Sequence, residues 1–176
     1  MATELIQAIR ADTRYKKFKK IVTEAQERVD FEKDRQEALS LHSGLVVRTL
    51  YGKKQYSSKT LLESLAQVQA NRSRLVELRV RSSIHISYVK EASSALKRYV
   101  YTAYADDMRN ADYRTKDQRE ALLMRLTALA EEFMSEGNSH LDLIDTLIKD
   151  LDQAGFAMKH MVEVLRLLDG KEGKIL

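Results

Sequence analysis

The fold is decided by residues 58–105, SKTLLESLAQVQANRSRLVELRVRSSIHISYVKEASSALKRYVYTAYA, which contain no glycine and no proline. Apolar residues recur every three or four positions along this stretch, from Leu61 through Val68 to Val100, which is the spacing of one helix face. At 1.5 Å per residue, a helix of this length extends about 70 Å. The stretch therefore predicts one very long helix with the spacing of a coiled coil.

The composition favours helices throughout the chain. Its 176 residues include no proline and only 6 glycines, and 44% are hydrophobic and 32% charged. We therefore expect an all-α, elongated protein with a hydrophobic core. Cysteine is absent and the four histidines lie far apart in the sequence, so no disulfide, metal or cofactor is expected.

No signal segment or membrane span is recognisable. The N-terminus lacks a charged segment followed by an apolar one, and the longest apolar runs are only a few residues. We expect a soluble, cytoplasmic protein that makes no membrane contact.

Two regions are expected along the chain. Residues 1–56 form a basic N-terminal extension, with one helix that ends near Ser43 and Gly44 and a connector at residues 51–56. Residues 57–176 hold the long helix and the C-terminal helices.

The C-terminal third predicts an antiparallel helical hairpin. Thr115 and Gln118 have the spacing of a capping box, so a helix is expected to begin at Thr115. Gly137 is expected to end this helix, and Ser139 to cap a second helix that reaches Gly170. A turn this short would pack the two helices against each other.

A glycine interrupts the apolar stripe of the last helix. Gly155 lies between Leu151 and Met158 on this stripe, and a glycine inside a helix costs about 1 kcal/mol relative to alanine. This cost indicates a close contact, so we expect the stripe to join copies of the chain in a homo-oligomer. The predicted interface residues are Leu151, Gly155, Met158, Val162 and Leu165.

Positive charge is concentrated in the first two thirds of the chain. Residues 1–60 hold 13 Lys and Arg against 8 Asp and Glu, and residues 61–114 hold 9 against 6. Residues 115–176 hold 8 against 12. The asymmetry predicts a polyanion partner for the basic part and a separate role for the acidic part.

Two short basic runs contain aromatic residues. The run RYKKFKK at residues 14–20 places Tyr15 and Phe18 among five cations, and YGKKQY at residues 51–56 repeats the pattern. Cations neutralise phosphates while aromatic rings stack on unpaired bases, so both runs fit single-strand binding. Alternatively, Tyr15 and Phe18 face the core and the lysines form a solvated helix face. The candidate DNA ligands here are Lys16, Lys17, Lys19, Lys20, Lys53 and Lys54.

The long helix carries a ladder of cations. Arg72 and Arg79 fall on its apolar stripe, where a buried charge is costly unless it is paired or faces water. A water-filled channel in an oligomer would accommodate them, and so would carboxylates from a partner chain in a coiled coil. The candidate DNA ligands on this helix are Arg72, Arg74, Arg79, Arg81, Lys90, Lys97, Arg98 and Tyr99.

No catalytic motif is present. The sequence has no nucleophile elbow, Gly-rich phosphate loop or paired-carboxylate motif, so enzymatic activity is not expected. His85 and His160 are interpreted as unrelated histidines rather than as a catalytic dyad. Asp142, Asp145 and Asp152 are interpreted as acids that favour the helix dipole rather than as a cation site.

Two segments carry a family resemblance. The segment GFAMKHM, residues 155–161, follows an Asp-rich amphipathic helix and resembles the C-terminus of the UvsY-like recombination mediators of tailed phages. Residues 95–99, ALKRY, resemble the basic Ala-Leu-Lys segment of that family, at a similar interval. The resemblance covers roughly residues 60–170. The chain departs from the family in its adjacent Lys97 and Arg98 and in an N-terminal extension of about 60 residues.

The resemblance implies a small helical oligomer that forms rings and binds single-stranded DNA in the cytoplasm of an infected bacterial cell. It implies that such a protein removes the single-strand-binding protein and loads the phage recombinase. It also implies that Lys97 and Arg98 contact DNA and that the last helix forms the subunit interface. The expected function is a single-stranded-DNA-binding recombination mediator, and the alternative is a phage structural or assembly protein whose long helices serve association alone.

Overall fold

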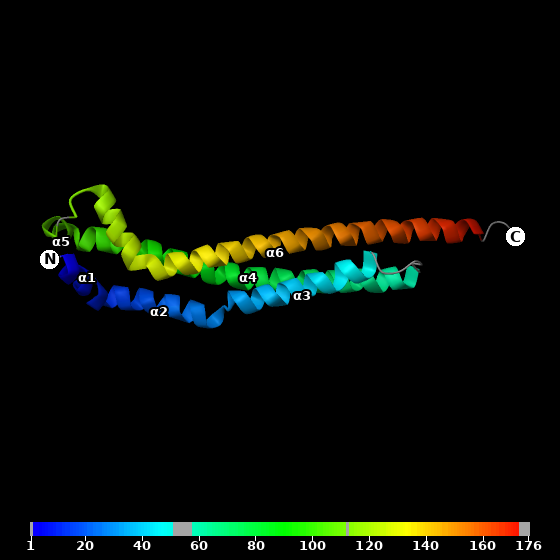
Figure 1. The fold of residues 1–176 in the computed structure, drawn as a ribbon, viewed down its shortest axis with the longest axis horizontal. Helices are drawn as coiled ribbons and strands as arrows, with labels where there is room; N and C mark the ends of the chain where they lie inside the picture. The colour runs from blue at the N-terminus through cyan, green and yellow to red at the C-terminus, as the bar shows by residue number, and fades with distance from the viewer. Residues whose placement is uncertain (1, 51–57, 112, 173–176) are drawn as a thin grey trace. The chain divides into compact units, whose positions relative to one another are not determined.

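The computed structural model describes residues 2–50, 58–111 and 113–172 (Figure 1). Within these residues every regular element is an α-helix, so the predicted all-α class is confirmed. The helices are α1 (Ala2–Ala11), α2 (Thr13–Arg28), α3 (Phe31–Leu50), α4 (Ser58–Ala103), α5 (Ala105–Asn110) and α6 (Lys116–Glu172). None of these helices is both long enough and apolar enough to cross a membrane.

The chain divides into two compact units, each built from two stretches. Unit 1 comprises Met1–Phe31 and Arg81–Ser139, and unit 2 comprises Glu32–Val80 and His140–Leu176. Helices α4 and α6 therefore contribute to both units. These boundaries differ from the expected division at residue 56.

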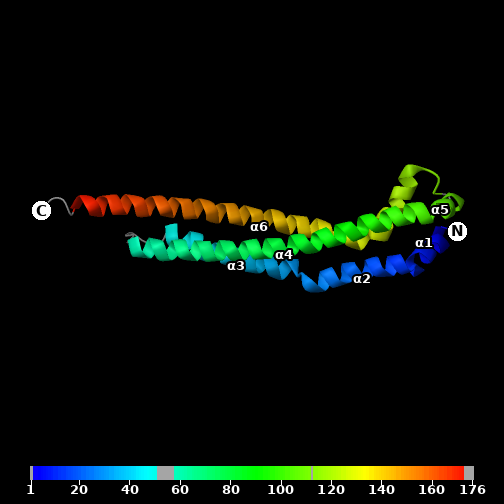
Figure 2. The ribbon, with the colours of Figure 1, turned by 180° about the vertical axis from the view of Figure 1, so that it is seen from behind.

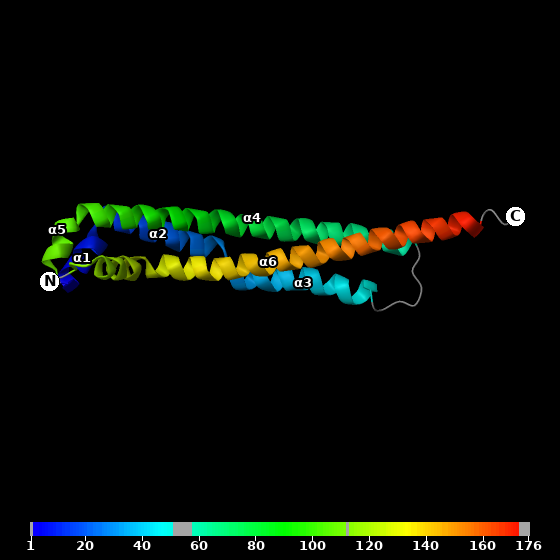
Figure 3. The same ribbon diagram turned by 90° about the horizontal axis from the view of Figure 1, so that it is seen from above.

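The predicted long helix is present as α4, which runs unbroken over 46 residues. Its buried apolar side chains follow the predicted spacing, and burying each one stabilises the fold by about 1.5–3 kcal/mol. They are Leu61, Val68, Leu75 and Leu78 in unit 2, and Ile86, Val89, Leu96 and Val100 in unit 1. In unit 2 this face packs with α3 and α6 (Figures 2 and 3), in a core that includes Ala38, Ile144 and Leu151.

The predicted C-terminal hairpin is wrong, because α6 continues through Gly137 without a turn. A Cβ at Gly137 would lie 2.6 Å from Ile86 Cδ1 and 2.9 Å from Phe31 Cζ. The glycine therefore permits close packing inside unit 1. Ser139 caps no helix, because its Oγ donates a hydrogen bond to the Ser135 carbonyl at 3.1 Å, one turn earlier in α6.

The start of α6 matches the predicted capping box. The Gln118 N–H donates to Thr115 Oγ1 at 3.2 Å, and the Thr115 N–H donates to Gln118 Oε1 at 3.0 Å. Two backbone donors at the helix start are thereby satisfied by side chains.

The N-terminal stretch forms three helices where one was expected. Asp12 interrupts the first helix: its backbone is extended and its carboxylate accepts the Arg14 N–H at 2.7 Å, which caps α2. Val29 is also extended and ends α2 as a buried residue. The expected helix end at Ser43 and Gly44 is wrong, because α3 continues to Leu50. The connector predicted at residues 51–56 lies outside the described residues.

Candidate nucleic-acid interface

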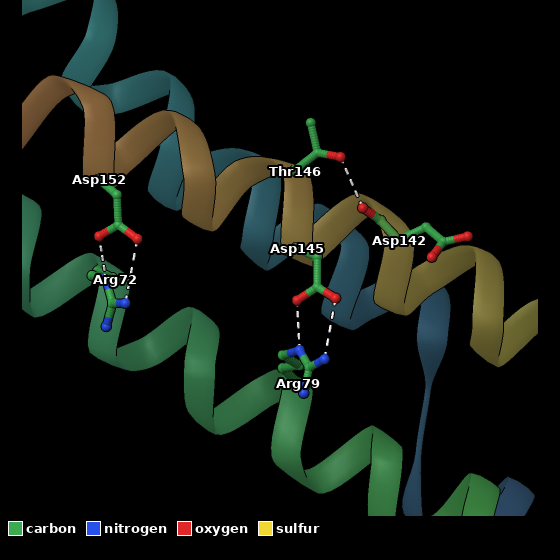
Figure 4. A network of polar contacts seen from close by, with 6 residues as sticks. All are labelled: Arg72, Arg79, Asp142, Asp145, Thr146 and Asp152. Atoms are coloured by element: carbon green, nitrogen blue, oxygen red, sulfur yellow. Dashed lines mark hydrogen bonds and ion pairs between the residues drawn. The ribbon is translucent and has the colours of Figure 1, made fainter.

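The cations on the apolar stripe of α4 are paired with carboxylates of the same chain (Figure 4). Arg72 donates two hydrogen bonds to Asp152, at 2.5 and 3.3 Å, and Arg79 donates two to Asp145, at 2.5 and 3.1 Å. All four residues belong to unit 2. Neither a channel nor a partner chain is required to satisfy these arginines. The carboxylates raise the pKa of both guanidinium groups, and the hydrogen bonds from Arg79 lower the pKa of Asp145.

Other members of the ladder are paired in the same way. Arg74 donates to Glu37 at 2.6 Å and to Glu77 at 2.9 Å, and both carboxylates raise its pKa. Lys97 donates to Glu131 at 2.7 Å in unit 1. Because each of these cations already has a carboxylate partner, a phosphate would have to compete for it. Arg72, Arg74, Arg79 and Lys97 are thus weaker candidate DNA ligands than the sequence indicates.

The densest group of available cations lies on α2. Lys16, Lys17 and Lys19 are exposed and make no ion pair within the described residues, and Lys20 lies 3.7 Å from Glu24. We call Lys16, Lys17, Lys19 and Lys20 the basic face of α2. On α4, Lys90 and Arg98 are also exposed, whereas Lys53 and Lys54 lie outside the described residues.

The aromatic residues of the α2 run face the protein interior. Phe18 is 5% exposed and Tyr15 is half-buried, with their ring centroids 5.9 Å apart. The alternative interpretation, in which the rings pack inward and the lysines are solvated, is confirmed. Bases cannot stack on these two rings while α2 keeps this packing.

A groove between α2 and α4 in unit 1 was not expected from the sequence. Its volume is about 710 Å³. Arg14 lies over the Tyr99 ring at one end, 4.3 Å from its centroid, and Arg28 and His85 line the groove as well. Small side chains leave this space open, namely Ala25 on α2 and Ala92 and Ala95 on α4. The lining residues are Arg14, Lys17, Phe18, Ile21, Glu24, Ala25, Arg28, His85, Tyr88, Glu91, Ala92, Ala95, Leu96 and Tyr99.

One end of the groove is held by a hydrogen-bond node at Asp12. The Asp12 carboxylate accepts the Tyr99 hydroxyl at 2.8 Å and the Tyr104 hydroxyl at 2.9 Å, in addition to the Arg14 N–H. These bonds, led by the one from Arg14, lower the pKa of Asp12. Burial and the Asp12 carboxylate raise the pKa of Tyr104 to about 12. Tyr99, predicted to contact DNA, is therefore engaged on its hydroxyl by Asp12 and on its ring by Arg14.

The other end of the groove is electropositive. Burial lowers the pKa of His85, and the charges of Arg28 and Arg81 lower it further. A neutral imidazole flanked by guanidinium groups is the expected state at neutral pH.

No cluster of His, Asp and Glu suited to a metal ion occurs in the described part of the chain.

The predicted subunit interface lies inside unit 2. Leu151 and Met158 are fully buried, Val162 is 5% exposed, Gly155 is buried, and Leu165 is partly buried. A Cβ on Gly155 would make ordinary contacts with Val68 and Leu65 of α4, at 3.6 and 3.8 Å. The stripe is thus covered by the chain's own helices, and it is not an outer surface.

A second apolar stripe on α6 is exposed instead. It consists of Phe156, Val164 and Leu167, which are 66%, 55% and 68% exposed. At about 100° per residue these three positions fall within roughly 80° of one another, away from the buried Met158. The sequence pattern alone did not separate this stripe from the buried one, because both have helical spacing.

A comparison with protein families, curated proteins and solved structures finds no match to the chain.

Proposed function

We propose that this protein binds single-stranded DNA through the basic face of α2 and acts as a non-enzymatic recombination mediator that helps load a phage recombinase. The observation that carries the proposal is the set of four exposed lysines within two turns of α2, three of them without an ion pair among the described residues. Phosphate neutralisation by such lysines dominates non-specific nucleic-acid binding. The mediator role, with a recombinase and a single-strand-binding protein as partners, rests on the family resemblance of residues 95–99 and 155–161.

The experiment is fluorescence anisotropy of labelled oligo-dT at low salt. The test variant replaces Lys16, Lys17, Lys19 and Lys20 with Gln, and it should lose at least tenfold in affinity because four phosphate contacts are removed. A matched control replaces the exposed cations Arg125, Lys149, Lys159 and Arg166 of α6 with Gln, which changes the net charge equally.

The control variant should stay within about threefold of the wild type. Equal losses in the two variants would show that only net charge matters and would refute the assignment to α2. Undetectable binding of the wild type at low salt would refute DNA binding itself.

The second candidate is a phage structural or assembly protein without DNA-binding activity. It is favoured by the exposed stripe of Phe156, Val164 and Leu167, since an uncovered apolar stripe is typical of an association surface. Both candidates include a homo-oligomer, which we propose forms through this stripe. Phe156→Ser with Leu167→Ser should lower the mass measured by light scattering, whereas Met124→Ser, at a position 63% exposed in unit 1, should leave it unchanged. An unchanged mass for the double variant would remove this stripe as the interface.

A further inference from the structure

We infer that the groove between α2 and α4 holds unpaired bases of the strand whose phosphates contact the basic face of α2. This inference rests on the proposed function and gives it a source of preference for single strands. Lys17 belongs both to the basic face and to the lining of the groove, so the two surfaces share an edge on α2. A strand that lies along the lysines therefore has the groove within reach of its bases.

The groove has the size and surface that bases require. From Arg14 to Arg28 it follows 15 residues of α2, whose ends lie about 21 Å apart at a rise of 1.5 Å per residue. Ile21 and Leu96 form apolar lining, and Tyr88 is 59% exposed. Aromatic and apolar surfaces beside a basic track are the combination that holds single strands without sequence preference.

Charges of both signs line the groove, whereas the basic face of α2 carries only cations. Glu24 and Glu91 line it together with Arg14, Lys17 and Arg28, so a phosphate inside the groove would meet carboxylates as well as cations. Neutral bases are not repelled by the carboxylates, and the N3–H of an unpaired thymine can donate a hydrogen bond to one. The phosphates are thus directed to the lysines outside the groove and the bases to the space inside. A duplex cannot use the groove, because pairing and stacking cover its base faces.

The test compares oligo-dT with an abasic phosphate chain of the same length, at one salt concentration, by competition in fluorescence anisotropy. The wild type should bind oligo-dT at least tenfold more tightly than the abasic chain, since stacking adds to phosphate binding. Ala95→Leu places a larger side chain in the groove at an exposed position and should reduce this ratio to nearly one, with unchanged affinity for the abasic chain. Tyr88→Ala should reduce the ratio in part, whereas Tyr88→Phe, which keeps the ring, should preserve it.

The matched control is Ser94→Leu, which adds a similar side chain at an exposed position of α4 that does not line the groove. It should keep the wild-type ratio, and circular dichroism should show equal helicity in all variants. Equal wild-type affinity for oligo-dT and the abasic chain would overturn the groove inference and leave phosphate binding intact. Equal loss of both ligands in Ala95→Leu would overturn it too, because the groove would then hold phosphates. Binding of neither ligand by the wild type would overturn the proposed function together with this inference.

Discussion

Gly137→Ala is expected to destabilise the protein, whereas Gly155→Ala is expected to stabilise it. Both residues lie inside α6, so both substitutions gain up to about 1 kcal/mol of helix propensity. The surroundings of the two glycines differ. A Cβ at Gly155 would meet Val68 and Leu65 at 3.6 and 3.8 Å, which is ordinary contact, so most of the gain is retained. We expect Gly155→Ala to raise the free energy of unfolding by about 0.5–1 kcal/mol.

At Gly137 the added methyl group has no room. It would lie 2.6 and 2.7 Å from two carbons of Ile86 and 2.9 Å from Phe31 Cζ. Both neighbours are buried, and the Phe31 ring packs against Phe133 with centroids 5.0 Å apart, which limits its retreat. Overpacking of this kind costs about 1–3 kcal/mol and exceeds the propensity gain. We expect a net loss of about 1 kcal/mol for Gly137→Ala.

Urea unfolding followed by circular dichroism, at one protein concentration, measures both changes from the midpoints at equal slope. A double-mutant cycle with Ile86→Ala tests whether the loss of stability comes from the contact between the new methyl group and the Ile86 side chain. Removing the Ile86 side chain leaves space for the new methyl group, so Gly137→Ala should cost less in that background, with a coupling of about 1 kcal/mol. If Gly137→Ala is as stable as the wild type or more stable, the close packing at Gly137 is refuted.

Three further outcomes are expected. Asp12→Asn should lower the midpoint of thermal unfolding by an amount equivalent to about 1 kcal/mol, since an amide keeps an oxygen to cap α2 but loses the charged oxygen that accepts the Tyr99 and Tyr104 hydroxyls. Because the pKa of Asp12 in the folded state lies below its ordinary value of 3.8, its carboxylate stabilises the fold above that pH, and this contribution is lost as the pH falls through the folded-state pKa. The loss of stability on acidification should therefore be smaller in Asp12→Asn, and an unchanged acid profile would contradict this. Ultraviolet titration should show one tyrosine that ionises near pH 12 and is missing in Tyr104→Phe. Because the pKa of Tyr104 is raised in the folded state, its contribution to the free energy of unfolding is present below the ordinary pKa of 10.0 and is lost as the pH rises through about 12. Removing both ion pairs of Figure 4 at constant net charge, with Arg72→Gln, Asp152→Asn, Arg79→Gln and Asp145→Asn, should leave the affinity for oligo-dT unchanged, and a tenfold loss would return the DNA site to α4.

Features that depend on one helix alone could be predicted from the sequence. The long helix α4 follows from 46 residues without a glycine or proline, and the start of α6 follows from two residues three positions apart. Gly137 was misread as a helix end because its role depends on Ile86 and Phe31, which lie far away in the sequence. Tertiary packing overrides the low helix propensity of glycine in such a case.

The candidate site depends on contacts between different helices, which the helical periodicity of a single segment does not reveal. The carboxylates that pair with Arg79 and Arg72 lie 66 and 80 residues further along the chain, so the sequence alone indicates both arginines as candidate DNA ligands. The groove exists because α2 packs beside α4. Ala25 and Ala92 indicate an open space only when this packing is known. The lysines of α2 were recognisable, because an exposed helix face is a property of one segment.

The most direct test of the account is the salt dependence of oligo-dT binding in the wild type and in two variants. One variant replaces Lys16, Lys17, Lys19 and Lys20 with Gln, and the other is the ion-pair variant of α4 at constant net charge. Each phosphate contact contributes about 0.7 to the slope of log affinity against log salt for a single strand. If the basic face of α2 holds the phosphates, the slope falls by about 2–3 in the α2 variant and stays at the wild-type value in the α4 variant. A wild-type slope in the α2 variant with a reduced slope in the α4 variant would contradict this assignment.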